Sequence, residues 1–153
     1  MSREPRTPTV RPGVVSVVLV NYRGAEDTIT CLRSFADLDW PRERLEVIVV
    51  DNDSGDGSAE RIRAEVPETI IVESGANTGF AGGCNLGVAH ATGEVIGFIN
   101  NDARPGPGWV RAGGGGPGGG RTLAPVAGKG LGWGGELGDY GDGARAWVVL
   151  GVK

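Results

Sequence analysis

The stretch Gly93–Asp102, Gly-Glu-Val-Ile-Gly-Phe-Ile-Asn-Asn-Asp, decides the fold that we predict for this chain. Its short apolar run starts after a glycine and ends abruptly in two amides and a carboxylate. Such a run is typical of a buried strand rather than a helix. Because ligands of open α/β sheets bind just beyond the carboxyl ends of the strands, we expect Asn100, Asn101 and Asp102 to lie where a ligand would bind.

Three further apolar segments precede this stretch and are separated by segments with helical spacing. The predicted strands are Val14–Val20, Leu45–Val50 and Thr69–Val72, and the predicted helices are Ala25–Leu38, Ser58–Val66 and Phe80–Ala91. The alternation with short connections predicts an α/β fold with a mostly parallel sheet. The last helix contains Gly82, Gly83 and Gly87, each of which costs about 1 kcal/mol of helix propensity relative to alanine. Their presence indicates that a strand or a ligand approaches the backbone closely.

Right-handed crossovers would bring the carboxyl ends of all these strands to one edge of the sheet. Three polar clusters would then meet there, namely Asn21-Tyr22, Asp51-Asn52-Asp53 and Asn100-Asn101-Asp102. Polar groups that converge at this edge predict a ligand site.

Length and composition limit the classes of protein to consider. With 153 residues the chain can form one domain with a real core, and a net charge of −4 argues against phosphate-neutralising nucleic-acid binding. The two cysteines form no metal pattern and no disulfide framework, which favours a reduced, cytoplasmic setting. No apolar run approaches the roughly 20 residues of a membrane span. Residues 1–13 lack the apolar core of a signal peptide, and we predict a disordered lead-in.

The usual ligand motifs do not match. A dinucleotide site needs G-x-G-x-x-G after the first strand, where this chain has Asn-Tyr-Arg-Gly, and there is no phosphate-binding P-loop. A calcium loop starting at Asp51 would have Asp56 and Ile62 at the positions that require Gly and Glu. The single histidine, His90, lies in the middle of a predicted helix, and we interpret it as a solvated helix residue.

Four motifs in order resemble the family 2 glycosyltransferases, in particular the bacterial rhamnosyltransferase-like branch. They occupy residues 15–22 (Val-Ser-Val-Val-Leu-Val-Asn-Tyr), 49–54 (Val-Val-Asp-Asn-Asp-Ser), 77–87 (Asn-Thr-Gly-Phe-Ala-Gly-Gly-Cys-Asn-Leu-Gly) and 98–102 (Phe-Ile-Asn-Asn-Asp). The resemblance covers about Val14 to Val110 and implies a GT-A fold, in which a Rossmann-like half that binds the nucleotide precedes a half that binds the acceptor.

The resemblance also implies a role for each cluster. The nucleotide-binding residues would be Asn21, Tyr22, Asp51, Asn52, Asn85 and Asn101. Asp102 would bind Mg²⁺ or Mn²⁺, because Asn101-Asp102 stands where the family carries its D-x-D metal motif. The implied donor is a dTDP- or UDP-linked sugar, with rhamnose as the indicated sugar, and the acceptor is a glycan or a lipid-linked glycan of cell-wall polysaccharide assembly. Peripheral contact with the inner face of the membrane remains open.

The C-terminal part departs from the family pattern. Of the 29 glycines, 18 lie at or after Gly106, and no helix should form over Ala112–Gly120. We therefore divide the chain into a nucleotide-sugar-binding region, 14–111, and a glycine-rich degraded tail, 112–153, which holds at most a partial hairpin. We expect a truncated chain that lacks the general base of the acceptor half and transfers sugar weakly or not at all. The alternative is a non-catalytic nucleotide-binding remnant or partner subunit.

Overall fold

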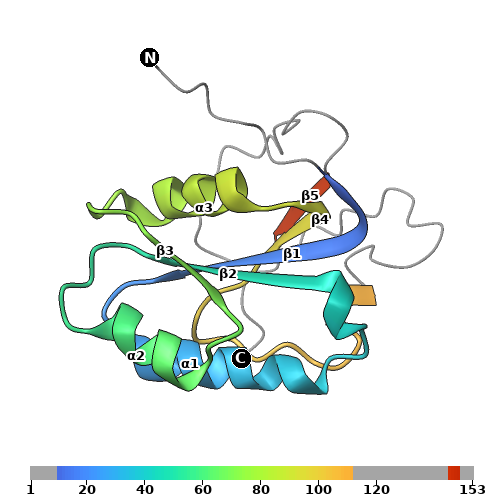
Figure 1. Ribbon diagram of the computed structural model, residues 1–153, viewed down its shortest axis with the longest axis horizontal. Coiled ribbons are helices and arrows are strands. Elements are labelled where there is room, and N and C mark those ends of the chain that lie inside the picture. The colour runs from blue at the N-terminus through green and yellow to red at the C-terminus, as the bar shows by residue number, and fades with distance from the viewer. Residues whose placement is uncertain (1–9, 112–144, 149–153) are drawn as a thin grey trace, which may run out of the picture.

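The computed structural model describes residues 10–111 and 145–148, and over these ranges strands and helices alternate as predicted (Figure 1). The strands are β1 (Arg11–Asn21), β2 (Leu45–Asp51), β3 (Ile70–Glu73), β4 (Gly93–Phe98) and β5 (Arg145–Val148). The α-helices are α1 (Ala25–Ser34), α2 (Ser58–Glu65) and α3 (Gly79–His90), and two 3-10 turns are η1 (Phe35–Asp37) and η2 (Arg42–Arg44).

The first strand starts earlier than the sequence indicates. We predicted a disordered lead-in up to Gly13, but β1 begins at Arg11, whose backbone N–H donates to the Thr92 carbonyl at 2.7 Å. The pairing with β4 is irregular between Arg11 and Val15, and Gly13 has a positive φ of 74° there. This irregular start contains an arginine and a proline instead of an apolar run, so apolar patterning alone could not find it.

The strands form one parallel sheet in the order β3-β2-β1-β4-β5, which confirms the predicted α/β architecture. The chain moves outward from β1 to β2 and β3 and then crosses back to place β4 on the other side of β1. The strand order therefore reverses at β1 and β4. Ligands of such sheets bind at this kind of reversal, outside the carboxyl ends of the strands.

The sheet is covered on both faces, with α1 and α2 on one side and α3 on the other (Figure 1). Val15, Val17 and Leu19 of β1 pack in the core that includes residues of α1 and α2. Val18 belongs to the second core cluster, together with Cys84 of α3. Burial of both faces explains the nearly continuous apolar sequence of β1.

The glycines of α3 allow that helix to lie very close to the sheet. A Cβ added at Gly83 would lie 2.9 Å from Val20 Cγ2, and one added at Gly87 would overlap the side chain of Val18. The close approach predicted from the sequence is therefore to a strand at these two positions.

Part of the predicted tail lies in the sheet, since β5 pairs in parallel with β4 from Val95↔Arg145 to Phe98↔Val148. The remainder of the tail, including its glycine-rich segment and the expected hairpin, lies outside the described residues. Among the residues that the structure describes, no helix is both long enough and apolar enough to cross a membrane. Cys31 and Cys84 are free and buried.

Candidate functional site

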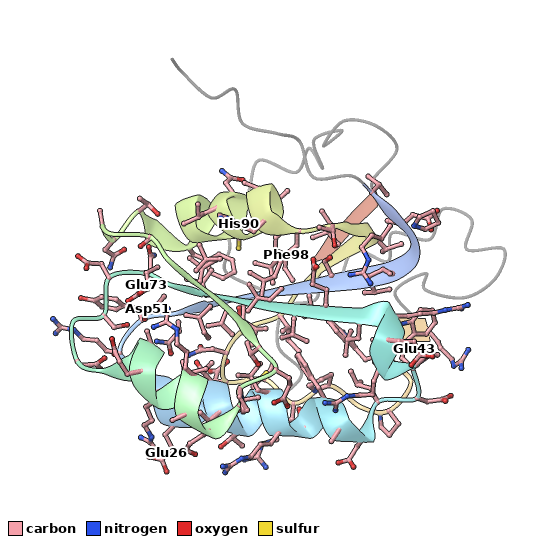
Figure 2. The ribbon with its side chains drawn as sticks, viewed as in Figure 1. Glu26, Glu43, Asp51, Glu73, His90 and Phe98 are labelled. Atoms are coloured by element: carbon pink, nitrogen blue, oxygen red, sulfur yellow. The ribbon has the colours of Figure 1, made fainter. Side chains whose placement is uncertain are left out.

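The carboxyl edge of the sheet brings two of the predicted polar clusters directly together. Asn21 at the end of β1 pairs in register with Asp51 at the end of β2, which in turn pairs with Glu73 of β3. Figure 2 shows Asp51 and Glu73 at this edge, whereas Glu43 lies at the opposite edge. The third cluster follows β4, the other neighbour of β1.

Asn21 is completely buried, and its amide connects the end of β1 to the end of β2, to the loop after β2 and to α1. Its Nδ2 donates to Asp51 Oδ1 at 3.0 Å and to Ser54 Oγ at 3.3 Å, and its Oδ1 accepts from Thr28 Oγ1 at 2.7 Å. Both ends of the amide are thus bonded to protein groups. Asn21 positions the surrounding groups, and a direct stack of a ligand on this side chain is sterically excluded by its burial.

Asp51 is 6% exposed and is held mainly by the loop that follows β2. Ser54 Oγ donates to Asp51 Oδ1 at 2.6 Å, and the Ser54 backbone N–H donates to Oδ2 at 3.4 Å. The long second contact leaves acceptor capacity on Oδ2, because an ionised carboxylate has about four lone-pair positions. Asp51 therefore offers a preorganised acceptor at the sheet edge.

Asn52 is 2% exposed and organises the loop before α3. Its Nδ2 donates to the Gly79 carbonyl at 2.9 Å and to Asn77 Oδ1 at 3.2 Å, while its Oδ1 accepts from the Thr78 backbone N–H at 3.1 Å. Ser74 Oγ also donates to Oδ1 at 3.3 Å. These bonds fix the loop that carries the third sequence motif against the end of β2.

Tyr22 and Arg23 stand at the mouth of the site. Tyr22 is 47% exposed, and the guanidinium carbon of Arg23 lies 5.3 Å from the centre of its ring. Arg23 has a left-handed backbone, with φ of 51°, which is held by bonds from its backbone N–H to Ser54 Oγ at 2.9 Å and from its Nε to the Ser54 carbonyl at 3.1 Å. An exposed aromatic ring beside a cation can stack on a planar heterocycle.

The loop after β4 is anchored to α1. Asn101 Nδ2 donates to Thr28 Oγ1 at 3.2 Å, and Cys31 Sγ donates to the Asn100 carbonyl at 3.8 Å. Burial raises the pKa of the Cys31 thiol to about 12, with a smaller contribution from the negative charge of Asp102, so the thiol stays protonated at neutral pH. Asp102 itself is exposed to solvent.

Asn85, the remaining predicted contact, is exposed on α3. The single histidine, His90, is exposed at the end of the same helix, with its Nδ1 3.0 Å from the Leu86 carbonyl. The exposure of His90 agrees with its interpretation as a solvated helix residue.

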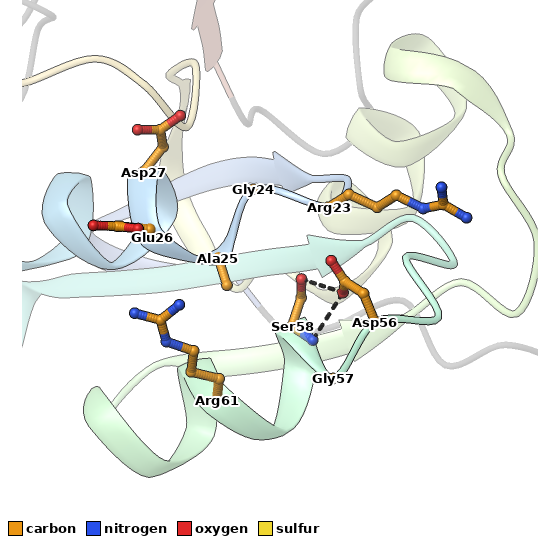
Figure 3. Close-up of a pocket in the computed structure, with 9 residues that line it drawn as sticks. All are labelled: Arg23, Gly24, Ala25, Glu26, Asp27, Asp56, Gly57, Ser58 and Arg61. Atoms are coloured by element: carbon orange, nitrogen blue, oxygen red, sulfur yellow. Dashed lines mark hydrogen bonds between the residues drawn. The ribbon is translucent and has the colours of Figure 1, made fainter.

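A hollow of about 370 Å³ lies beside this edge, between the N-termini of α1 and α2 (Figure 3). Its lining includes Arg23, Glu26, Asp56 and Arg61. Asp56 accepts from both the hydroxyl and the backbone N–H of Ser58, and these bonds, led by the hydroxyl, lower the pKa of Asp56 below its usual value. Neither Asp51 nor Asp102 lines this hollow, so it adjoins the polar edge and shares only Arg23 with the mouth of the site.

Comparison with known proteins decides the family. Residues 16–112 match the family model described as "Glycosyl transferase family 2". The chain belongs to glycosyltransferase family 2. This assignment confirms the resemblance that the four motifs carry, and the matched segment includes every predicted site residue.

Relatives in this family are similar over a limited part of their length. The glycosyltransferase AglE of Haloferax volcanii is 31% identical over 103 residues, which are 65% of this chain and 34% of AglE. The chain therefore spans about a third of the length of this curated relative.

Solved structures of GT-A glycosyltransferases confirm the GT-A fold. The mannosyltransferase PcManGT of Pyrobaculum calidifontis, in complex with GDP-Man and Mn²⁺, superimposes with a TM-score of 0.58 at 28% identity, covering 71% of this chain and 34% of that one. TarS of S. aureus, in complex with UDP-GlcNAc, gives a TM-score of 0.57 at 25% identity, covering 65% of this chain and 29% of that one.

The donor atoms at the sheet edge fit a divalent metal that is shared with a phosphate ligand. Among residues 10–111 and 145–148, no three His, Cys, Asp or Glu side chains gather as a metal site. Asp102 nevertheless supplies one exposed carboxylate, next to the amides of Asn100 and Asn101. Mg²⁺ can be held by one or two carboxylates plus substrate phosphates, and this donor set meets that requirement.

Two residues that connect the site escaped the sequence interpretation. Ser54 bonds to Asn21, Arg23 and Asp51, and Thr28 joins Asn21 to the loop after β4. Thr28 did leave a signal, since it is a hydroxyl on the face of a predicted helix that also carries apolar residues. A buried hydroxyl needs a hydrogen-bond partner, which points to a nearby polar group.

Proposed function

We propose that this chain binds a nucleoside-diphosphate sugar at the carboxyl edge of the sheet and serves the donor side of a glycosyl transfer. The observation that carries the proposal is a relay of hydrogen bonds that joins Asp51 to the loop bearing Asp102. The relay runs from Asp51 through Asn21, Thr28 and Asn101. It lies beside the reversal of strand order, in a member of family 2. The complexes of PcManGT with GDP-Man and Mn²⁺ and of TarS with UDP-GlcNAc support a nucleotide sugar as the ligand.

In this proposal the base lies toward β1 and β2. The exposed ring of Tyr22 stacks on the base, and Asp51 Oδ2 accepts a hydrogen bond from a ring N–H or a ribose hydroxyl. Asn52 acts by holding the 74–79 loop, because its own amide is bonded to that loop. Asn21 acts through Asp51, and Asn85 and Asn101 lie on the segments that face the ligand.

The diphosphate would lie toward β4, where Asp102 would hold Mg²⁺ or Mn²⁺. A bound divalent ion supplies charge neutralisation for the departing nucleoside diphosphate. The exposed position of Asp102 leaves its carboxylate free to share that ion with a ligand. The two amides before it, and the anchor of their loop on α1, keep the carboxylate at the edge of the sheet.

The proposal also covers the donor, the acceptor and the cellular location of the reaction. We take the donor to be dTDP- or UDP-linked, with rhamnose as the sugar, and the acceptor to be a glycan or a lipid-linked glycan. We place the reaction in the cytoplasm, with contact at the inner face of the membrane. The four sequence motifs of the rhamnosyltransferase-like branch are the support for this choice.

Isothermal titration of the chain with UDP, dTDP and GDP, each with and without Mn²⁺, tests donor binding. We expect one of the three to bind in a Mn²⁺-dependent manner and Asp102→Ala to abolish the dependence. The matched control is Asp37→Ala, which removes an exposed aspartate from η1. Because α1 runs back from the carboxyl edge, η1 at its end lies away from the proposed site. Absence of binding, or Mn²⁺ dependence unchanged in Asp102→Ala, would refute the proposal.

Transfer is tested separately with dTDP-rhamnose and UDP-linked sugars as donors and lipid-linked glycans as acceptors. Turnover supports the whole enzymatic proposal. Donor binding without turnover leaves the nucleotide-binding role in place and favours the non-catalytic alternative.

A further inference from the structure

We propose that Thr28 is a positioning residue that couples the base side of the site, at Asp51, to the metal side, at Asp102. This inference rests on the proposed donor binding. Thr28 lies on α1, and its hydroxyl forms no hydrogen bond with either carboxylate. It acts through the side-chain amides of Asn21 and Asn101, to which its hydroxyl is hydrogen-bonded.

The Thr28 hydroxyl is fully buried and bonded in two directions. It donates to Asn21 Oδ1 at 2.7 Å and accepts from Asn101 Nδ2 at 3.2 Å. A hydroxyl has a single proton to donate, so the bond to Asn21 fixes where that proton points. With its oxygen held by Thr28, Asn21 must direct its NH₂ group toward Asp51, as observed at 3.0 Å.

The same side chain orients the metal side. Asn101 directs its NH₂ group at Thr28, and the next residue in the chain is Asp102. One turn further along α1, Cys31 bonds to the carbonyl of Asn100, which also accepts from the Ala103 backbone N–H at 3.1 Å. Helix α1 therefore holds the turn at two successive residues immediately before Asp102.

Gly24 leaves the space that this arrangement needs. A Cβ added at residue 24 would lie 2.9 Å from Asn101 Nδ2 and 3.7 Å from Asn21 Oδ1. Gly24 has a φ of −132°, so alanine meets no backbone obstacle there and would act mainly by displacing the Asn101 amide. The glycine thus provides a second way to disturb the relay without removing any of its polar groups.

A relay with this geometry makes the two halves of the site interdependent. A metal ion and diphosphate that order the Asp102 turn also order Asn101, and through Thr28 and Asn21 they order Asp51. In thermodynamic terms, Mn²⁺ then raises the affinity for the nucleotide by more than its direct contact with phosphate provides, and the excess is a coupling between sites. Buried networks of this kind are resolved by double-mutant cycles.

The experiment measures the ratio of the UDP dissociation constants without and with Mn²⁺, using dTDP or GDP if the wild-type chain prefers one of them. Thr28→Val keeps the shape of the side chain and removes the hydroxyl, whereas Thr28→Ser keeps the hydroxyl. Thr30→Val makes the same change on the same helix outside the relay and is the matched control. We expect Thr28→Val to lower the Mn²⁺ enhancement about three- to tenfold. Thr28→Ser and Thr30→Val should stay within about twofold of wild type.

A double-mutant cycle tests the route of the coupling. If Thr28 acts through Asn101, then adding Thr28→Val to Asn101→Ala lowers the enhancement no further. Gly24→Ala should lower the enhancement like Thr28→Val, and it provides the test if Thr28→Val does not fold.

The outcomes separate the two claims. A wild-type chain that binds none of the nucleotides refutes the proposed function itself. A wild-type chain with Mn²⁺-enhanced binding, whose enhancement is equal in Thr28→Val, Gly24→Ala and Thr30→Val, refutes the coupling alone. Loss of enhancement in Thr28→Val with recovery in Thr28→Ser supports it.

Discussion

Replacing Gly87 by alanine is expected to destabilise the protein although alanine is the better helix former. The added Cβ would overlap Val18 Cγ1 and would lie 3.3 Å from both Val18 Cγ2 and Val50 Cγ2. Val18 and Val50 are buried on the two central strands β1 and β2, so neither side chain can rotate into free space. Overpacking of this kind costs about 1–3 kcal/mol, and the overlap with a buried strand places Gly87→Ala near the upper limit.

The opposing contribution is helix propensity, which favours alanine over glycine by about 1 kcal/mol. The net effect is therefore a loss of about 2 kcal/mol in the free energy of unfolding. For a chain of 153 residues such a loss lowers Tm by about 4–8 °C.

Gly108→Ala is the control, because an added Cβ there would meet no atom within 4 Å. Gly108 is exposed and does not have a positive φ, so alanine fits without strain. We expect this variant to be as stable as wild type or more stable by up to about 1 kcal/mol. Urea unfolding followed by circular dichroism measures both variants. A Gly87→Ala protein that equals Gly108→Ala in stability would refute the packing of α3 described here.

Three further predictions concern polar groups that are buried or half-buried. Glu46 accepts hydrogen bonds from the backbone N–H of Thr92 at 2.8 Å and from the Thr92 hydroxyl at 2.7 Å. In urea titrations, Glu46→Ala should therefore lower the free energy of unfolding by about 3 kcal/mol, and Glu46→Gln should lower it by less. Burial raises the pKa of Cys31 and of Cys84 to about 12 from 9.0. The stabilisation that comes from keeping these thiols neutral should therefore be fully present below pH 9 and be lost as the pH rises toward 12, which unfolding measured as a function of pH would show. At pH 8 both thiols should react with iodoacetamide far more slowly in the native than in the unfolded chain, and equal rates would contradict their burial. Ser54→Ala, which removes a donor from the carboxylate at the end of β2, should weaken UDP binding in the titration described above by about tenfold; an unchanged dissociation constant would remove Ser54 from the site.

Much of the fold follows from the sequence because its elements differ clearly in period. The β-branched run of β1 and the helical spacing of α1 each match one type of structure, and their alternation limits the sheet to a parallel arrangement. The predicted start of β1 was wrong because residues 11–13 join the sheet through backbone hydrogen bonds and an irregular pairing with β4. Such pairing does not require apolar side chains, so the sequence shows no apolar pattern there.

That polar residues gather at the carboxyl edge of the sheet could be predicted from the sequence, whereas the contacts among them could not. An asparagine at the end of a strand can face a ligand or the protein interior, and the sequence around Asn21 does not distinguish these two orientations. Its partners Asp51 and Ser54 are 30 and 33 residues away, so only the folded chain reveals that its amide is buried and bonded. The same holds for Asn52, whose partners lie in the loop before α3. Thr28 is a helix residue that we did not predict from the sequence, and it joins this group because its hydroxyl bonds to Asn21 and to Asn101, which is far away in the sequence.

We propose that Asp102 and the turn before it hold a divalent ion when a nucleoside diphosphate binds. The most direct measurement is the paramagnetic broadening of backbone amide signals when Mn²⁺ is added to the ¹⁵N-labelled chain in the presence of UDP. We predict that the amides of Asn100, Asn101 and Asp102 broaden first, that those of η1 stay sharp, and that Asp102→Ala removes the effect. Broadening centred instead on Glu26 and Asp56, in the neighbouring hollow, or no localised broadening at all, would contradict the account.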